Sequence, residues 1–522
     1  IEQSGYGILA FITNHGYLDN PTFRGMRQSL MQTFDEIYIL DLHGNQKRKE
    51  TCPDGSKDVN VFDIKQGVSI GIFIKETDNG TPAKIHHADL YGLRKNKYEW
   101  LAENDIENTK WQELTPQKPF YLFKPLDYES FDEYNNSWKI TDIFPLNGVG
   151  LTTARDHVVI DFEKRGLIKR ATLFRDSKES NAELCRKLHI PMKKGWNISN
   201  ARELIKKENS LQNFIYQIRY RPFDDRLIFY HDSLVWRTVK KVMYHMLTGE
   251  NCGLNFMRQV ALDEKYTHFG VTRNIIDNRA FYSNKGIMSL APLYLYPMQK
   301  SNDLFEHSEW PAGKGGRVPN LSPEFVREFA HSVKLEFVSD GFGDLKKTFG
   351  PEDVFHYIYA VFHSPEYRKR YAEFLKIDFP RVPLPKSKLL FCKLCSIGEE
   401  LSKLHLMEAP ILEDDKKRPK FPVEGSSIVE KGYPQYVAHA DRPQKGKVYI
   451  NKDQYFEGVR PEVWEFHIGG YKVCEKWLKD RRQRELSYED KSHYQKIVVA
   501  LGETIRLMNE PCLSEMFQQN PA

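Results

Sequence analysis

The order of apolar runs and amphipathic segments in the first 75 residues constrains the fold of this chain more than any other feature. Short apolar runs occupy 7–13, 37–42 and 68–74, and the first of them ends at a turn-forming Asn-His-Gly sequence. Between the first two runs, apolar residues over 23–34 recur at spacings of three and four, which predicts an amphipathic helix. This order predicts a mostly parallel α/β sheet, with 7–13 as a buried parallel strand.

Helical periodicity dominates the chain after residue 340. Helices are predicted to begin at Pro351 and, behind a Ser-Pro-Glu cap, at Pro365, and two more are predicted over 471–478 and 494–508. The segment 83–150 shows no long helical period, so we expect a connector of short helices and strands. The predicted architecture is an α/β sheet followed by an α+β region that ends in a helical part.

The composition excludes several classes of protein. The 522 residues include 76 Lys and Arg against 71 Asp and Glu, a net charge of +5, which argues against intrinsic disorder. No apolar stretch approaches the about 20 residues of a membrane helix, and no secretory signal is visible. Seven cysteines are too few for a disulfide framework, so we expect a reducing cytoplasm. Cys392 and Cys395 are expected to be thiols rather than metal ligands, because no second ligand pair stands nearby.

The first hundred residues resemble part of a known catalytic domain. Phe11-Ile12-Thr13-Asn14, Ile39-Leu40-Asp41-Leu42, Val61-Phe62-x-x-Lys65 and the run from Val68 to Lys75 are similar to the last third of an adenine-specific DNA methyltransferase domain. The resemblance implies that Phe62 stacks on an adenine rotated out of the duplex and that Lys65 lies beside the same pocket. We therefore expect the Phe62 ring to be exposed at the carboxyl side of the sheet. A core position is the alternative, since Phe is mostly buried.

Two motifs of that methyltransferase family do not occur in these 522 residues. They are the Gly-containing cofactor motif and the Asn-Pro-Pro-Tyr motif, whose polar groups hold the adenine amino group. We therefore predict no catalytic residue and no metal site in this chain. The resemblance implies S-adenosylmethionine as the cofactor of a parent protein, with none bound by this chain alone. Because the sequence starts without Met and runs directly into a strand pattern, we expect it to be cut from a longer polypeptide.

Basic residues among aromatic and β-branched neighbours are frequent between 148 and 341. The guanidinium fork matches the two major-groove acceptors of guanine and also pairs with phosphates, so these residues are candidates for DNA contacts. The alternative for any single arginine is an internal ion pair that fixes a loop, as in Arg155-Asp156. The predicted DNA-binding residues are Arg155, Arg219, Arg221, Arg226, Arg237, Lys240, Lys241, Arg258 and Arg273.

The second half of the chain carries the most specific resemblance. The segments 358–368, 374–381 and 463–471 look like the C-terminal specificity region of type ISP and similar single-chain restriction-modification enzymes. In that family one polypeptide joins a nuclease, a helicase-like ATPase, an adenine methyltransferase and a target recognition domain. The resemblance covers nearly the whole chain but matches only the end of the methyltransferase and the recognition region.

The two resemblances together imply a division of the chain and a function. Residues 1–85 would be an α/β methyltransferase-sheet fragment, 86–147 a connector, 148–341 an α+β DNA target recognition domain and 342–522 its helical C-terminal part. The implied function is sequence-specific DNA recognition for an adenine methyltransferase. Its partners would be double-stranded DNA and the upstream part of the same polypeptide, and no membrane. A stand-alone nucleic-acid-binding module and a carbohydrate-binding protein are the alternatives, and steep salt dependence of duplex binding would exclude the second.

Overall fold

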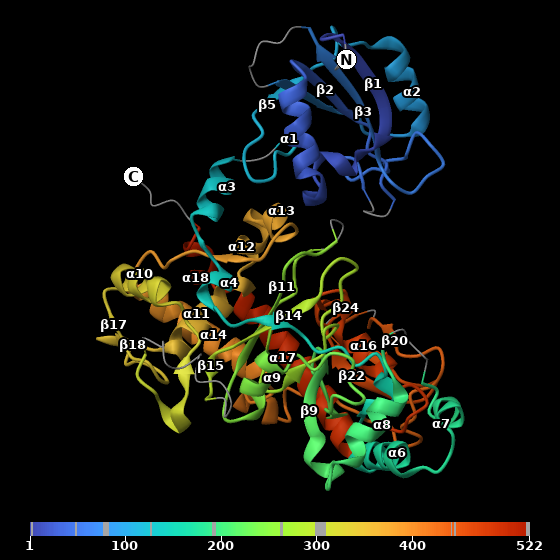
Figure 1. Ribbon diagram of the computed structural model, residues 1–522, viewed down its shortest axis with the longest axis vertical. Coiled ribbons are helices and arrows are strands. Elements are labelled where there is room, and N and C mark those ends of the chain that lie inside the picture. The colour runs from blue at the N-terminus through green and yellow to red at the C-terminus, as the bar shows by residue number, and fades with distance from the viewer. Residues whose placement is uncertain are drawn as a thin grey trace. The chain divides into compact units, whose positions relative to one another are not determined.

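The computed structural model (Figure 1) describes residues 1, 4–46, 50–76, 83–125, 128–190, 195–261, 265–297, 310–439, 441–442 and 445–517. These residues form two compact units, one of Ile1–Glu133 and one that starts at Tyr134. Each unit builds its own β-sheets.

A five-stranded sheet forms the centre of the first unit, in the order β1-β3-β2-β4-β5. β3 pairs antiparallel with β1 and with β2, β2 pairs parallel with β4, and β4 pairs antiparallel with β5. The predicted mostly parallel sheet is therefore wrong. β1, β2 and β4 do run in one direction, but β3 is reached through a loop rather than a crossover helix and runs the opposite way between β1 and β2. The strands are β1 (Gly7–Asn14), β2 (Glu36–Asp41), β3 (Val68–Lys75), β4 (Lys84–Asp89) and β5 (Gln112–Leu114).

β1 lies at the edge of this sheet, so the prediction of a buried strand over 7–13 is also wrong. Ile8 is 68% exposed and Ile12 is 44% exposed. The predicted helix is confirmed as α1 (Arg24–Thr33), but of its expected apolar stripe Met26 is exposed and Phe34 is buried. Periodicity identifies a helix without showing how much of its apolar face another element covers.

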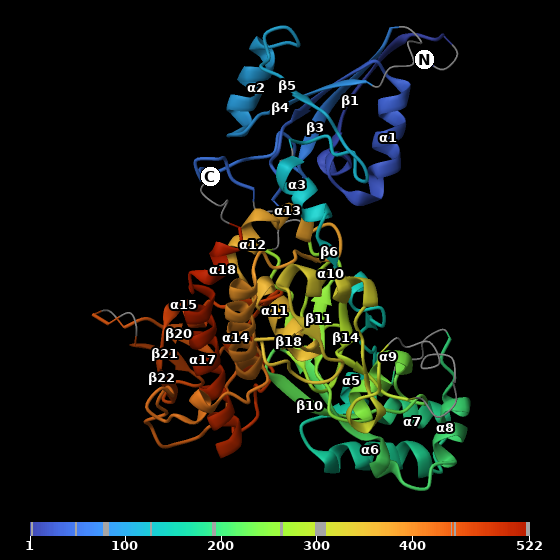
Figure 2. The same ribbon diagram turned by 90° about the vertical axis from the view of Figure 1, so that its left-hand side faces the viewer.

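Two hydrophobic clusters lie on the two faces of the sheet. One contains Phe34, Ile37 and Phe73, with Leu30 of α1 packed against it. The other contains Leu42 and is extended by Trp100 of α2 (Arg94–Glu103). The two helices accordingly cover opposite faces of the sheet (Figure 2).

Two four-stranded sheets open the second unit, in the orders β12-β11-β14-β7 and β13-β9-β10-β8. The pairings are antiparallel except for β13 with β9. Helix α6 (Lys164–Asp176) packs on β10 and on α8 (Ile198–Lys206). The strands are β7 (Gly148–Val149), β8 (Ile160–Asp161), β9 (Ile215–Arg221), β10 (Asp224–Phe229), β11 (Gly253–Met257), β12 (Gly270–Thr272), β13 (Ile275–Ile276) and β14 (Met288–Pro292).

A layer of helices follows after residue 350. The predicted helices are confirmed as α11 (Pro351–His363), α12 (Pro365–Arg370), α16 (Val473–Lys479) and α17 (Tyr488–Met508), and Ser364 caps α12 as expected. α14 (Lys388–His405) was not predicted; it packs between α11 and α17 and carries Cys392 and Cys395 (Figure 2). A three-stranded sheet was not predicted either, so the C-terminal part is not purely helical. Its strands are β20 (Gln435–Val437), β21 (Gly446–Tyr449) and β22 (Tyr455–Val459).

The predicted boundaries at 85, 147 and 341 stay predictions. The first sheet continues past 85, because β4 pairs with β2 and β5 pairs with β4. Among the residues that the structure describes, no helix is long and apolar enough to cross a membrane.

Candidate nucleic-acid interface

The carboxyl ends of β1, β2 and β4 meet at one edge of the first sheet, because these strands run in the same direction. His15 follows β1, His43 follows β2, and Asp89 ends β4. β3 begins at this edge, since Val68 pairs with Asn14. Open α/β sheets bind ligands at the carboxyl ends of their strands, so this edge is a candidate site.

Phe62 lies on the loop that leads into β3, and it is 42% exposed. Its N–H donates to Asn60 Oδ1 at 2.8 Å, and the buried Asn60 side chain donates to the Gln66 carbonyl at 2.6 Å. Arg94 of α2 donates to the carbonyls of Asn60 and Phe62 at 2.8 and 2.9 Å. The backbone of the loop is therefore fixed while the Phe62 ring stays partly exposed.

A buried ion pair and a glycine hold the base of this loop. Lys97 Nζ donates to Asp58 Oδ1 at 2.6 Å, and both side chains are fully buried. Gly44 has φ of 77°, and a Cβ atom there would overlap the backbone of Asn60. A side chain at position 44 would therefore displace the residue that orients Phe62.

The exposure of Phe62 is inconsistent with the core alternative and agrees with the expectation of an exposed ring. Lys65 is exposed on the same loop. Although the sheet is not mostly parallel, the loop lies beside the carboxyl ends of β1, β2 and β4, as expected. Contacts of Phe62 and Lys65 with an extruded adenine stay predictions.

Titratable side chains gather at the same edge. His15 Nδ1 lies 2.9 Å from Asp41 Oδ1, His43 Nε2 lies 2.7 Å from Asp89 Oδ1, and His43 Nδ1 lies 3.6 Å from Glu50 Oε1. Burial alone lowers the pKa of His43, but hydrogen bonding to Asp89 and the nearby Glu50 carboxylate raises this pKa to about 9. His43 is therefore an imidazolium at neutral pH.

Asp41 is the fully buried carboxylate of this cluster. Burial raises its pKa, but Lys124, 2.9 Å away, and the histidines outweigh burial and hold the pKa well below its usual range. His43 adopts a left-handed backbone conformation with φ of 51°, which is uncommon for a residue other than glycine. This cluster was not predicted from the sequence, although polar residues directly after the predicted strands were a usable signal.

Four of the predicted DNA-binding arginines are internal to the second unit. Arg155 is 1% exposed, and its guanidinium carbon lies 3.7 Å from the centroid of the Trp196 ring. The other three form ion pairs on β9 and β10: Arg219 with Asp225 at 2.5 Å, Arg221 with Asp277 at 3.0 Å, and Arg226 with Asp224 at 2.7 Å. This geometry favours the ion-pair alternative for Arg219, Arg221 and Arg226. Arg155 is buried without the expected ion pair to Asp156 among the described residues, and donates instead to the Leu234 carbonyl at 3.1 Å. DNA contacts by the four stay predictions.

The other five predicted residues are exposed. Lys240 pairs with Asp232, Arg258 with Asp378 at 3.1 Å, and Arg273 with Glu408 at 2.5 Å. Within the described ranges, neither Arg237 nor Lys241 has a carboxylate partner. Arg237 and Lys241 flank the start of α9 (Lys240–Leu247), so this part of the second unit presents basic groups to solvent.

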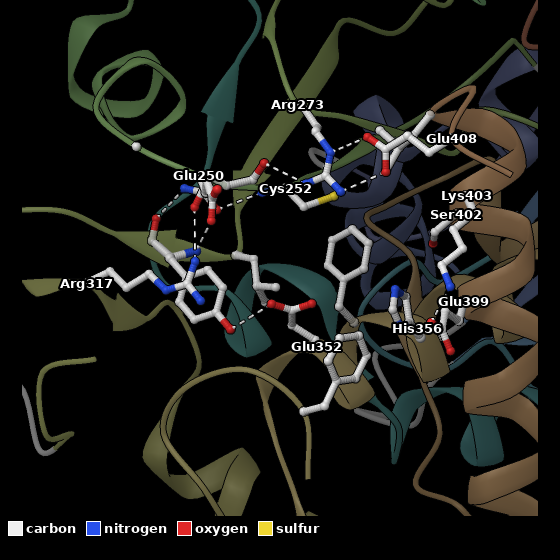
Figure 3. A pocket seen from close by; sticks show the side chains of 17 residues that line it. Glu250, Cys252, Arg273, Arg317, Glu352, His356, Glu399, Ser402, Lys403 and Glu408 are labelled. Atoms are coloured by element: carbon white, nitrogen blue, oxygen red, sulfur yellow. Dashed lines mark hydrogen bonds and ion pairs between the residues drawn. The ribbon is translucent and has the colours of Figure 1, made fainter. Parts of the chain in front are cut away.

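A cavity of about 670 Å³ in the second unit contains Arg273 (Figure 3). Carboxylates outnumber cations in its lining, and the cations are already paired: Arg273 with Glu408, Lys403 with Glu399 at 2.6 Å, and Arg317 with Asp340 at 2.7 Å. Burial raises the pKa of Glu352 in the same wall, although Arg317 opposes this shift. An excess of carboxylates repels phosphate, so the cavity does not fit the DNA backbone.

The family profile described as the Type ISP C-terminal specificity domain matches residues 142–510. None of the curated proteins matches the sequence. The profile covers α4 (Ile140–Ile143) in part and almost all later elements, including both four-stranded sheets and the helical layer.

Solved structures share the fold at low sequence identity. The ATP-dependent Type ISP restriction-modification enzyme LlaBIII bound to DNA is 20% identical with a TM-score of 0.65, and the match covers 97% of this chain and 33% of that chain. The DrdV–DNA complex is 21% identical with a TM-score of 0.65, covering 97% and 50%. A nuclease-deletion mutant of the Type ISP enzyme LlaGI in complex with a DNA substrate mimic is 19% identical with a TM-score of 0.59, covering 97% and 46%.

This chain thus spans half or less of the length of the structures that it matches. Because the specificity-domain profile matches well over half of its 522 residues, the chain belongs to the Type ISP C-terminal specificity domain family.

Proposed function

We propose that this chain reads a specific DNA sequence for a restriction-modification enzyme. The observation that carries the proposal is the match of residues 142–510 to a specificity-domain family. Three solved structures with the same fold, each a complex with DNA or a DNA substrate mimic, support it. The partner in this proposal is double-stranded DNA, together with other domains of a longer polypeptide.

Exposed basic side chains of the second unit supply the DNA contacts in this proposal. Arg237 and Lys241 are the best candidates for phosphate contacts, because the described residues leave them without a carboxylate partner. Each of Lys240, Arg258 and Arg273 must first break its ion pair with a carboxylate before it can contact DNA. Arg155 and the three ion-paired arginines act as supports that orient strands and loops, rather than as readers of bases.

The first unit supplies part of a pocket for an extruded adenine in this proposal. Phe62 stacks on the base and Lys65 lies beside it, while S-adenosylmethionine is bound by other parts of the parent protein. The exposed Phe62 ring on a loop fixed by Asn60 and Arg94 supports this assignment. An aromatic face in that position partly restores the stacking that the base loses when it leaves the duplex.

Selection from a pool of random duplexes tests the proposal. The intact parent protein is incubated with the pool, and the retained fraction is sequenced. We expect enrichment of one sequence, bound at least about 1,000-fold more tightly than unrelated duplex, and transfer of a labelled methyl group to an adenine within it. Retention without enrichment would contradict sequence reading, and binding that does not depend on salt would contradict phosphate contacts.

A further inference from the structure

The polar cluster at the edge of the first sheet brings three metal-ligating groups together. One ligand atom each of His15, His43 and Glu50 lies within 4.8 Å of the other two. The two histidines are buried and Glu50 is half-buried. All three lie in the first unit, outside the specificity-domain match.

Both histidines use their second ring nitrogen to contact a carboxylate. His15 Nδ1 lies 2.9 Å from Asp41, and His43 Nε2 lies 2.7 Å from Asp89. Histidines that bind metals almost always donate the second ring N–H to a carboxylate, a backbone carbonyl or water, because this contact fixes the tautomer and directs the other nitrogen to the ion. The arrangement leaves His15 Nε2 and His43 Nδ1 as the ligand atoms.

His43 Nδ1 is buried and lacks a hydrogen-bond partner among the described residues. It lies 3.6 Å from Glu50 Oε1. Two ligands of a tetrahedral zinc ion are about 3.3 Å apart when each bond is about 2.0–2.1 Å long. A small inward movement of the Glu50 carboxylate therefore brings this pair to ligand spacing.

We infer that His15, His43 and Glu50 bind one divalent ion of the zinc class, which displaces the Nδ1 proton of His43 to solvent. Two imidazoles and one carboxylate suit Zn²⁺ and Co²⁺, whereas Mg²⁺ and Ca²⁺ require oxygen ligands. Asn45 Nδ2 lies 3.0 Å from His15 Nε2, so this amide turns when the ion binds and presents its oxygen or admits water.

The bound ion joins two segments that are distant in sequence. His15 follows β1, whereas His43 and Glu50 follow β2, and Gly44 between them packs on Asn60 at the base of the Phe62 loop. The ion thereby stiffens the edge of the sheet from which Phe62 projects. This inference concerns the first unit by itself and does not depend on the proposed function.

Titration of the full chain with Zn²⁺ after chelator treatment tests the inference. We expect one high-affinity Zn²⁺ per chain by calorimetry, a rise in melting temperature with Zn²⁺, and no such rise with Mg²⁺. Co²⁺ should give the visible bands of a nitrogen and oxygen site without the intense thiolate absorption of cysteine ligands. Absence of Zn²⁺ binding by the wild-type chain, or thiolate absorption with Co²⁺, would overturn the assignment.

Substitutions locate the bound ion. His43→Gln and Glu50→Gln should each weaken Zn²⁺ binding at least tenfold. Asp89→Asn should weaken it about 10–100-fold, because Asp89 no longer orients the His43 ring. His86→Gln is the matched control, since His86 lies on β4 and stacks on Tyr38 outside the three ligands. Unchanged Zn²⁺ affinity in folded His43→Gln and Glu50→Gln chains would show that Zn²⁺ binds elsewhere. The cluster would then be a network of ion pairs between protonated histidines and carboxylates, without a metal ion.

Discussion

Phe62 is the residue at which base stacking and core packing give opposite expectations. Because Phe62 is 42% exposed, Phe62→Ala should lower the free energy of unfolding by much less than the about 3–5 kcal/mol of a core Phe. It should instead weaken binding of an extruded base by about 1–3 kcal/mol. Chemical denaturation and methyl transfer by the parent protein measure the two effects. Phe73→Ala, in the core of the same unit, is the control for packing. An equal loss in the free energy of unfolding in both variants would contradict the stacking role of Phe62.

Gly44 supports Phe62 from a distance through Asn60. Gly44→Ala places a Cβ atom on the Asn60 backbone, so we expect about 1–3 kcal/mol of overpacking in addition to the about 1–2 kcal/mol of left-handed strain. Gly55→Ala is the matched control, because Gly55 has φ of 83° and its added Cβ would meet nothing within 4 Å. Melting temperatures measure the two losses, and we expect the larger decrease for Gly44→Ala. A Gly55→Ala loss as large as that of Gly44→Ala would show that backbone strain, not contact with Asn60, decides the cost.

At the scale of secondary-structure elements, the start of α9 carries the exposed charges that DNA should meet. Replacing both Arg237 and Lys241 with Ala should weaken binding to all duplexes alike and reduce the salt slope by about 0.9 for each lost phosphate contact. Fluorescence anisotropy at several salt concentrations measures both quantities. Replacing both Arg165 and Lys169 on the exposed face of α6 with Ala removes the same number of charges and is the control for net charge. Equal losses in the control would assign the effect to overall charge rather than to this helix.

Asp224 on β10 connects elements that lie 257 residues apart, because Arg481 after α16 donates to it at 2.9 Å. Burial raises the pKa of Asp224, but Arg481 and Arg226 outweigh burial and lower it. A carboxylate with a lowered pKa stabilises the fold above its unfolded pKa, and the stabilisation is lost as the pH falls through the folded pKa. Asp224→Asn should therefore cost about 3 kcal/mol or more at pH 7. Denaturation at a series of pH values should show the difference from wild type shrinking below about pH 4, whereas a constant difference would contradict this ion-pair account.

Apolar periodicity predicted the elements well and their partners poorly. The runs at 7–13, 37–42 and 68–74 all form strands, but the direction of β3 depends on how the chain returns to the sheet after β2. No local pattern encodes that path. α14 was not predicted because its apolar residues are too numerous to form one clear stripe at helical spacing. The central part of this helix is buried on several sides.

The candidate sites were predictable to different degrees. The exposed position of Phe62 was expected from the resemblance of the first hundred residues to an adenine-specific methyltransferase domain, not from the Val-Phe dipeptide alone. Arg219, Arg221 and Arg226 look like base readers in sequence, yet β9 and β10 place each beside an aspartate. Polar residues directly after the predicted strands indicated the edge at which this cluster lies, but the pairing of His15 with Asp41 and of His43 with Asp89 required the strand order.

For the molecule as a whole, charge is nearly balanced, with 76 basic and 71 acidic side chains. Affinity for duplex DNA must therefore come from a local group of cations rather than from a uniform positive potential. The motifs at 358–368, 374–381 and 463–471 indicated the family whose profile matches residues 142–510, whereas the change of unit between Glu133 and Tyr134 was not among the predicted boundaries.

The open side of β1 determines how this polypeptide behaves in concentrated solution. Ile8, Leu9 and Ile12 are exposed on an edge strand, and such an edge acts as a template for strand addition by another copy. We expect the isolated chain to self-associate as its concentration rises, as measured by analytical ultracentrifugation. Ile8→Lys should suppress the association, because a charge on an edge strand opposes intermolecular pairing. Leu204→Lys on α8, at a similarly exposed apolar position, should leave it unchanged, and equal suppression by both lysines would assign the association to general hydrophobicity rather than to the β1 edge.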